Sequence, residues 1–385
     1  MRKKELEYQG FEQGPIRPPS EAYSLLIRIT RNCPWNHCAF CGVYKGTRFS
    51  IRPVDHVIRD IDEVYRYVKT IMDLADENGN VQASDIQKAV GNITACDLPP
   101  FQAAYNWMAG GMQSVFLQDA NSLIIKPADL MRILEHLKMR FPWVKRITSY
   151  ARSHTIARIS DDDLAGIRSA GLNRIHIGLE SASDEVLKMM KKGVTKADHI
   201  KAGRKAKRAG IELSEYVMPG LGGRKQSRVH ALETADALNR INPDFIRIRT
   251  LALPGGIPLL DEVAAGRFEK PTDTEMILEI YTMIDALEGI DSTIVSDHIL
   301  NMFQEVEGKL PKDKDRVLGV LQMYLDMDPD EQCLYQVGRR LGYFTFLADL
   351  KNPELRSRVE QRRERLKITP ENVDDVLNRV TQRFV

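Results

Sequence analysis

The chain reads Tyr23-Ser-Leu-Leu-Ile-Arg-Ile-Thr-Arg-Asn-Cys-Pro-Trp-Asn-His-Cys-Ala-Phe-Cys41 near its amino-terminal end. The first eight residues of this stretch form a mostly apolar run that predicts a buried β-strand. The run leads directly into a loop that holds Cys33, Cys38 and Cys41 within nine residues. Three thiols this close together are typical of a metal or iron–sulfur site rather than of core packing. We therefore expect a metal centre at the carboxyl end of the first strand.

Five further strands are predicted after this first one, separated by segments with helical spacing. They lie at Ser114–Gln118, Val144–Tyr150, Arg174–Leu179, Ile211–Met218 and Phe245–Leu251. Six strand–helix units in series predict a parallel sheet with right-handed crossovers. Six is fewer than the eight strands of a closed barrel. The predicted fold class is therefore α/β, with a partial (β/α)6 TIM-like barrel.

The predicted barrel spans residues 22–255 and follows an N-terminal extension at 1–21. A helical insertion is expected at about 76–111, between the first two strands. After Pro254-Gly-Gly-Ile-Pro258 the pattern changes to charged segments with helical spacing. We expect residues 256–385 to form a mostly helical C-terminal domain.

The composition is that of a globular enzyme in a reducing compartment. The chain has 385 residues, 43% hydrophobic and 28% charged, and its formal net charge of +2 gives no sign of nucleic-acid or membrane affinity. Met1–Ser20 is charged and contains prolines, so it is not expected to be a signal peptide. No run of about 18 apolar residues predicts a membrane span. Five cysteines do not make a disulfide framework in a chain of this length, so we expect a cytoplasmic location.

The cysteine loop has two interpretations. A zinc site usually combines two pairs of ligands, and only the isolated Cys96 and Cys333 remain, although His37 could be a fourth ligand. The iron–sulfur interpretation is favoured by Phe40, an aromatic residue beside the last cysteine. It is also favoured by the place of the loop after the first strand, because barrel active sites lie at the carboxyl ends of the strands.

On these residues the chain resembles the radical S-adenosylmethionine (radical SAM) superfamily, over roughly residues 23–251. The resemblance implies that Cys33, Cys38 and Cys41 are catalytic and hold a [4Fe–4S] cluster. The fourth iron would bind the amino and carboxylate groups of S-adenosylmethionine. One electron would then cleave the sulfonium and release a 5′-deoxyadenosyl radical, which abstracts hydrogen from a substrate. The spacing here is Cys-x4-Cys-x2-Cys, whereas the common family spacing is Cys-x3-Cys-x2-Cys.

The resemblance also implies cofactor contacts in the first half of the chain. Phe40 matches a family position near the adenine, or is simply packed in its loop. The stretch Gln118-Asp-Ala-Asn-Ser122 replaces the family's Gly-Gly-Glu-type turn. There Asp119 would accept the methionyl ammonium with help from backbone groups of Gln118 to Asn121, although an Asx turn would explain the same residues. Arg152 could bind the methionyl carboxylate or an acidic substrate, since arginine forms paired hydrogen bonds with carboxylates.

Further contacts are implied at the ends of later strands. Glu180, within Gly178-Leu-Glu-Ser181, matches a segment whose polar groups meet the ribose or the carboxylate; helix capping is the alternative. Ser214 could reach the methionyl part or the ribose. The backbone near Leu251 would be available to the adenine.

Through motifs such as Gly178-Leu-Glu-Ser181, the chain resembles the branch of the superfamily that contains oxygen-independent coproporphyrinogen oxidase and the methylthiotransferases. The resemblance implies a small-molecule, polar substrate and an electron donor such as flavodoxin or ferredoxin. Arg356–Lys367 alternates arginine and glutamate, which indicates a solvated helix, so a nucleic-acid partner is not expected. Two other functions stay open: a non-catalytic iron–sulfur electron carrier and a zinc-stabilised binding module.

Overall fold

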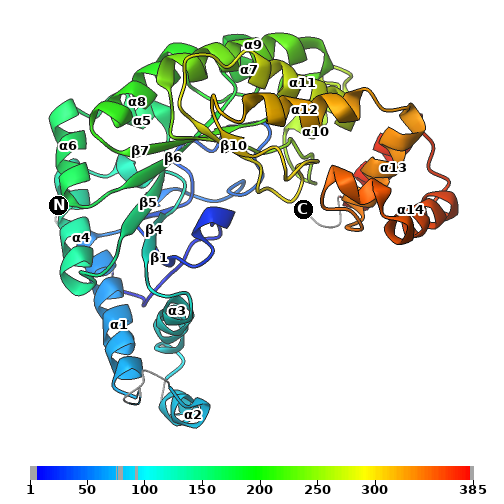
Figure 1. Cartoon of the computed structure of the whole chain (residues 1–385). Helices are drawn as coiled ribbons and strands as arrows, with labels where there is room; N and C mark the ends of the chain where they lie inside the picture. Colours follow the sequence, from blue (N-terminus) through cyan, green and yellow to red (C-terminus); the bar gives the residue numbers. More distant parts are fainter. Residues whose placement is uncertain (1–6, 75, 77–80, 92–93, 382–385) are drawn as a thin grey trace. The chain divides into compact units, whose positions relative to one another are not determined.

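The chain folds around a mostly parallel eight-stranded sheet in a computed structural model that describes residues 7–74, 76, 81–91 and 94–381 (Figure 1). The strands hydrogen-bond in the order β1-β4-β5-β6-β7-β8-β9-β10. Their bounds are β1 Leu25–Arg28, β4 Ser114–Gln118, β5 Arg146–Ala151, β6 Arg174–Glu180, β7 Glu212–Val217, β8 Phe245–Ile248, β9 Thr293–Val295 and β10 Gly308–Lys309. A short pair, β2 (Thr30–Arg31) and β3 (Ser50–Ile51), is antiparallel and separate from this sheet.

The predicted α/β fold with a partial barrel is confirmed. The six predicted strands correspond to β1 and β4–β8, in the order of the sequence. β9 extends the sheet in parallel with β8, and β10 closes the series as an antiparallel edge. The sequence did not predict these two strands, which are only three and two residues long.

Contacts divide the chain into two compact units. The first comprises the described parts of Met1–Pro34, Gly46–His176 and Lys205–Glu212. Its helices are α1 Val54–Met72, α2 Ala83–Gly91, α3 Leu98–Ala109, α4 Pro127–Arg140, α5 Ser153–Ile156 and α6 Asp161–Ala170. Helix α1 packs on α3 and α4 through a buried apolar face that includes Ile61, Val64 and Val68.

The predicted insertion at about 76–111 contains α2 and α3, with residues 77–80 and 92–93 outside the described part of the chain. The first unit has a regular register along its strands. Leu25 pairs with Val115, and Arg28 pairs with Gln118. The end of β1 therefore lies beside the end of β4, where the sequence predicts a cofactor contact.

The second unit comprises Trp35–Lys45, Ile177–Arg204 and the described part of Leu213–Val385. Its helices are α7 Asp184–Met189, α9 Gly223–Ile241, α10 Leu259–Ala264, α11 Asp273–Asp285, α12 Lys314–Leu325, α13 Pro329–Arg340, α14 Pro353–Arg365 and α15 Val373–Thr381. Helix α8, Lys196–Arg208, begins in this unit and ends in the first. The domain boundaries at 21 and 255 stay a prediction.

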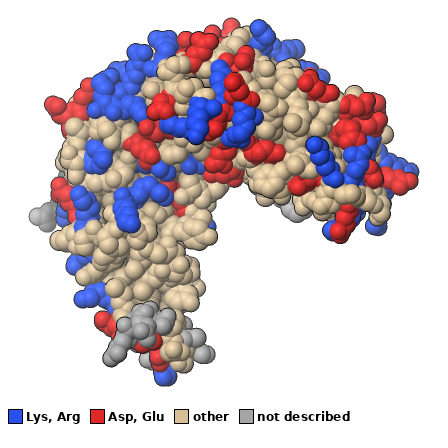
Figure 2. Space-filling view, in the orientation of Figure 1, with Lys and Arg blue, Asp and Glu red and all other residues tan. Residues whose placement is uncertain are grey.

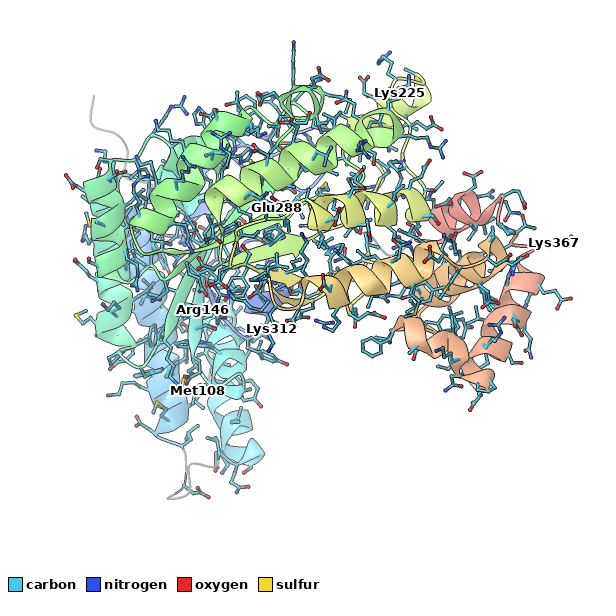
Figure 3. All side chains as sticks on the ribbon, turned by 45° about the horizontal axis from the view of Figure 1, so that its top comes forward. Met108, Arg146, Lys225, Glu288, Lys312 and Lys367 are labelled. Carbon is cyan, nitrogen blue, oxygen red and sulfur yellow. The ribbon has the colours of Figure 1, made fainter. Side chains whose placement is uncertain are left out.

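Helix α11 packs between α9 and α12 in the second unit (Figure 1). The side chain of Asn239 near the end of α9 donates to the Ala286 carbonyl and accepts from the Glu288 amide just after α11. Figure 3 shows Lys225 at the start of α9 and Glu288 toward the other end of that helix. The two helices therefore run side by side in the same direction.

None of the described helices combines the length and the apolar character needed to cross a membrane.

Candidate active site

The cysteine loop is held in the second unit from Trp35 onward. The Trp35 indole donates to the Lys191 carbonyl at 2.7 Å, and the Ala39 amide donates to the Met190 carbonyl at 2.9 Å. The ring of Trp35 fills the space beside Gly193, whose added Cβ would lie 2.3 Å from it. The hydrogen bonds of Trp35 and Ala39 both attach the cysteine loop to the turn after α7. Trp35 lies between Cys33 and Cys38, where the loop is one residue longer than the common spacing.

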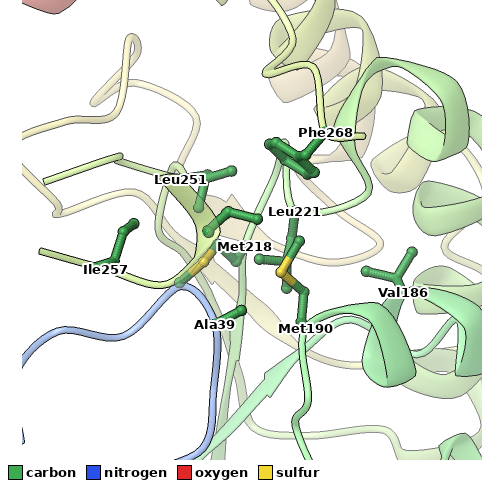
Figure 4. Close-up of a cluster of buried hydrophobic side chains, with 9 residues drawn as sticks. Ala39, Val186, Met190, Met218, Leu221, Leu251, Ile257 and Phe268 are labelled. Atoms are coloured by element: carbon green, nitrogen blue, oxygen red, sulfur yellow. The ribbon is translucent and has the colours of Figure 1, made fainter. Parts of the chain in front are cut away.

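A buried hydrophobic cluster continues this attachment (Figure 4). Ala39 packs there with Met190 from the end of α7, Met218 from the end of β7 and Leu251 from the segment after β8. The predicted adenine contact Phe40 packs against the same cluster and is half-buried. The cluster therefore brings Leu251 together with Ala39, the residue before Phe40, within the second unit.

None of the five cysteines forms a disulfide bond. Cys33, Cys38 and Cys41 are each partly exposed, whereas Cys333 is buried and Cys96 is exposed. Among the described residues, no three histidine, cysteine or acidic side chains converge as ligands of one metal ion. A cubane cluster does not require such convergence, because each cysteine thiolate binds a different iron.

Glu180 ends β6 in an uncommon conformation, with a φ of 64°. Its Oε1 accepts from Lys192 Nζ at 3.4 Å, and its Oε2 is buried with no hydrogen-bond partner in the described part of the chain. Gly178 makes room for this pair, because a Cβ there would lie 2.3 Å from Glu180 Oε1. The Lys192 ammonium also lies 5.7 Å from the centre of the Phe40 ring. Glu180, Lys192 and Phe40 therefore form one polar and aromatic group.

A second carboxyl group, Glu215 on β7, belongs to this neighbourhood. It is fully buried, and neither of its carboxyl oxygens has a hydrogen-bond partner among the described residues. Burial raises the pKa of Glu215 well above its usual value; the Lys192 charge opposes this rise and the Glu180 charge adds to it. Burial therefore favours the neutral form of the Glu215 carboxyl group.

Ser214 on β7 lies in a different arrangement. The Arg247 guanidinium on β8 donates from Nε to Ser214 Oγ at 3.2 Å and forms an ion pair with Asp297 at 2.6 Å. Arg247 is buried, so the pair with Asp297 removes the cost of an isolated buried charge. Ser214 keeps its hydroxyl proton for a further hydrogen bond.

The first unit holds Asp119 in an ion pair. Its Oδ2 accepts from Arg28 Nη2 at 2.7 Å and from the Asn32 amide at 3.2 Å, and its side chain is fully buried. Glu12 in turn pairs with Arg28 at 3.3 Å and with Arg52 at 2.6 Å. The predicted ammonium acceptor therefore already has a cationic partner on β1.

The neighbouring predicted residues are occupied by local contacts. Gln118 accepts from the Gly14 amide at 2.8 Å and donates to the carbonyls of Gly14 and Ile16, so its side chain anchors the N-terminal segment. Asn121 accepts from the Arg152 amide at 3.2 Å, which joins the segments after β4 and β5. The sequence expectations for Gln118, Asn121 and Arg152 as cofactor contacts stay predictions.

Sequence reasoning did not select Lys192, Glu215 and Arg28 for this site. Glu215 carried a signal, since it is an acidic residue inside an otherwise apolar strand segment. Lys192 follows a helix end and Arg28 lies in a strand, and neither position stands out in the sequence. Their partners lie 12 and 91 residues away along the chain, respectively.

Comparison with known families adds an independent finding. Residues 102–235 match the family model of the radical SAM superfamily. The predicted radical SAM domain is therefore confirmed over these residues. The chain is an enzyme, as the sequence predicted.

Two curated proteins are similar to part of this chain, both named tRNA uridine(34) acetyltransferase. The Methanocaldococcus infernus protein is 27% identical over 126 residues, which are 31% of this chain and 23% of that protein. The Methanocaldococcus jannaschii protein is 29% identical over 115 residues, which are 29% of this chain and 20% of that protein. The chain thus matches less than a quarter of the length of these curated relatives.

Solved structures of radical SAM proteins are also similar. Coproporphyrinogen III oxidase from Escherichia coli has 16% identity and a TM-score of 0.44, with 68% of this chain and 51% of that chain covered. A radical S-adenosylmethionine methyltransferase from Kitasatospora setae, solved with cobalamin and a [4Fe–4S] cluster, has 15% identity and a TM-score of 0.44. That match covers 94% of this chain and 66% of the other.

Proposed function

We propose that this enzyme cleaves S-adenosylmethionine reductively at a [4Fe–4S] cluster held by Cys33, Cys38 and Cys41, and that hydrogen is then removed from a polar substrate. The supporting observation is the loop of three cysteines, none of them in a disulfide, in a chain that carries a radical SAM domain. When bound, the cluster would supply one electron to the sulfonium and release a 5′-deoxyadenosyl radical. Three thiolates leave one iron for the amino and carboxylate groups of the ligand.

The second unit offers suitable groups for the rest of the ligand. Glu180 has a buried carboxyl oxygen without a partner in the described chain, and such an atom favours a bound donor such as an ammonium or a ribose hydroxyl. The Lys192 ammonium donates to the other carboxyl oxygen of Glu180. The Ser214 hydroxyl can donate a hydrogen bond to the ligand. Phe40 and the backbone near Leu251 would contact the adenine. Together these groups suit a ligand that has both charges and a flat aromatic base.

Asp119 is a further residue that we propose for ligand binding. It would receive the methionyl ammonium, and Arg28 would hold the Asp119 carboxylate in place. Gln118 would hold the N-terminal segment against this edge, and Asn121 would fix the backbone that carries Arg152. The side chain of Arg152 would then meet a carboxylate of the cofactor or of the substrate.

A small polar molecule is the substrate class we propose. Both signs of charge are mixed on the face seen in Figure 2. On α14, Arg356 pairs with Glu331 and Glu360, and Arg363 pairs with Asp330, so these arginines are already neutralised. Phosphate backbones are bound by basic groups that are available to them.

The names of the two curated relatives support a second candidate, a tRNA substrate. A filter-binding titration with total tRNA at two salt concentrations separates the two candidates. A small-molecule enzyme shows only weak binding that disappears at higher salt, whereas a tRNA enzyme retains binding.

We further propose a flavodoxin or ferredoxin as electron donor and a cytoplasmic location.

Single cysteine substitutions test the cluster assignment. We expect Cys33→Ala, Cys38→Ala and Cys41→Ala to lose the iron–sulfur absorption after anaerobic reconstitution, while the wild type holds about four iron atoms per chain. Cys96→Ala and Cys333→Ala are matched controls and should keep the wild-type spectrum. A colourless wild type with about one zinc per chain would instead support the zinc-stabilised module. A normal cluster in Cys38→Ala would contradict the assignment and point to His37 as a ligand.

A further inference from the structure

A buried polar network in the second unit joins the segments after β6 and β7 to two helices behind them. Its central members are His230 on α9 and Glu279 on α11, which are 3% and 4% exposed. Ser181, directly after Glu180, is fully buried and contacts His230. None of these three residues contacts the cysteine loop in the hydrogen bonds described above. The network therefore contacts the backbone segments that carry the proposed cofactor residues, and not the cysteine loop.

The hydrogen-bond directions follow from the groups involved. His230 Nε2 lies 3.1 Å from the Met218 carbonyl, which can only accept, so Nε2 carries the proton. Burial lowers the pKa of His230 to about 4, so the ring is neutral and Nδ1 is an acceptor. The Ser181 hydroxyl, 2.8 Å away, then donates to Nδ1, and its oxygen accepts from the Ser183 amide. His230 thus bridges the segments after β6 and β7.

Glu279 holds the turn after β7 at its next residues. Its Oε1 accepts from the Gly220 amide at 2.7 Å and lies 3.4 Å from His230 Nε2, while its other oxygen accepts from the Ser227 hydroxyl. Gly220 has a φ of 88°, and a Cβ there would lie 2.8 Å from the sulfur of Met276, also on α11. The turn therefore lies tightly against α11, and Glu279 is its side-chain anchor.

The anchored turn is connected to the proposed cofactor contacts by backbone bonds. The Met218 amide donates to the Glu180 carbonyl at 3.0 Å, and the Leu251 amide donates to the Pro219 carbonyl at 3.0 Å. Displacement of the turn would therefore move the backbone of both Glu180 and Leu251.

We propose that His230 and Glu279 are positioning residues, which hold the segments after β6, β7 and β8 in the arrangement that binds S-adenosylmethionine. Neither residue touches the ligand. Glu279 acts most strongly as a carboxylate, because a charged acceptor makes a shorter and stronger bond to the Gly220 amide than a neutral one. This inference rests on the proposed function of the chain.

The charge state of Glu279 makes the arrangement depend on pH. Burial raises the pKa of Glu279 to about 7, against hydrogen bonds from Ser227 and Gly220 that lower it. From α9 the facing titratable group is the neutral His230, and Arg224 at the start of α9 is paired with Glu269 and Glu275. From α12, Lys314 donates to the carbonyls of Asp285 and Leu287. Glu279 should therefore become a carboxylate as the pH rises through neutrality.

Equilibrium dialysis of S-adenosylmethionine against the reconstituted enzyme tests the proposal between about pH 6 and pH 8. We expect Glu279→Gln to bind roughly fivefold more weakly than the wild type at about pH 8, and equally at about pH 6. At each pH the dissociation constant of the variant is divided by that of the wild type. The titration of the ligand affects both constants equally and cancels in this ratio. Asp285→Asn, at the exposed end of the same helix, is the matched control and should give a ratio of one throughout.

A second variant and a second measurement complete the test. Ser227→Ala removes a hydrogen bond that lowers the pKa of Glu279, so the midpoint of the pH profile should move upward by roughly one unit. Hydrogen exchange at about pH 8 should be faster in residues 218–223 of Glu279→Gln than in the wild type. A ratio that is constant with pH, or unchanged exchange in these residues, overturns the positioning role while leaving the proposed function intact. A wild type that binds no S-adenosylmethionine at any pH overturns both.

Discussion

The buried carboxyl group of Glu279 should cost the enzyme stability at neutral and alkaline pH. Its pKa rises from 4.5 to about 7 on folding, so the folded chain binds the proton more tightly than the unfolded chain. The stabilisation from this proton is fully present below the unfolded pKa and is lost as the pH rises through about 7. A shift of this size corresponds to roughly 3 kcal/mol. Glutamine at this position has the same shape and no titration.

The assay is urea unfolding of the full chain, wild type and Glu279→Gln, at several values between about pH 5 and pH 8. The difference in the free energy of unfolding between the two proteins should change by roughly 2.5 kcal/mol over this range, in favour of the variant at the alkaline end. Other titrating groups are common to both proteins and cancel in the difference. Parallel stability profiles for the two proteins would refute the reasoning, because they would mean that Glu279 titrates alike in both states.

Two further substitutions test the supports of the site. Gly193→Ala should lower the iron content after reconstitution, because the new Cβ would lie 2.3 Å from the Trp35 ring; Gly210→Ala has a similar φ with open space around it and should keep full iron content. Asp119→Ala should destabilise the chain by about 3 kcal/mol in urea unfolding, because it leaves the mostly buried Arg28 without its nearest carboxylate; a loss below about 1 kcal/mol would contradict this account of the pair.

The strands were predictable because each one is a short apolar run in a chain of alternating elements. Ser114–Gln118 has the predicted bounds, since a buried apolar run is a strong local signal. β9 has three residues and β10 has two, which is too short for any periodic pattern.

The partners of the site residues were much less predictable. Gln118 was expected to help Asp119 through its backbone, and the sequence did not predict that its side-chain amide binds the backbone of Gly14 and Ile16. Asp119 was identified as an acceptor, whereas its pairing with Arg28 depends on the register between β1 and β4. Such contacts arise from the packed chain, and no local sequence signal encodes them.

The most direct test of the central proposal is the cleavage of S-adenosylmethionine itself. The enzyme is reconstituted anaerobically, reduced with dithionite and incubated with S-adenosylmethionine, and the products are separated by liquid chromatography with mass detection. We predict that 5′-deoxyadenosine forms in the wild type and in Cys96→Ala, and does not form in Cys33→Ala, Cys38→Ala or Cys41→Ala. The radical assignment would be contradicted if the reconstituted wild type formed no 5′-deoxyadenosine and its cluster spectrum did not change on addition of S-adenosylmethionine. The non-catalytic electron carrier would then be the better explanation.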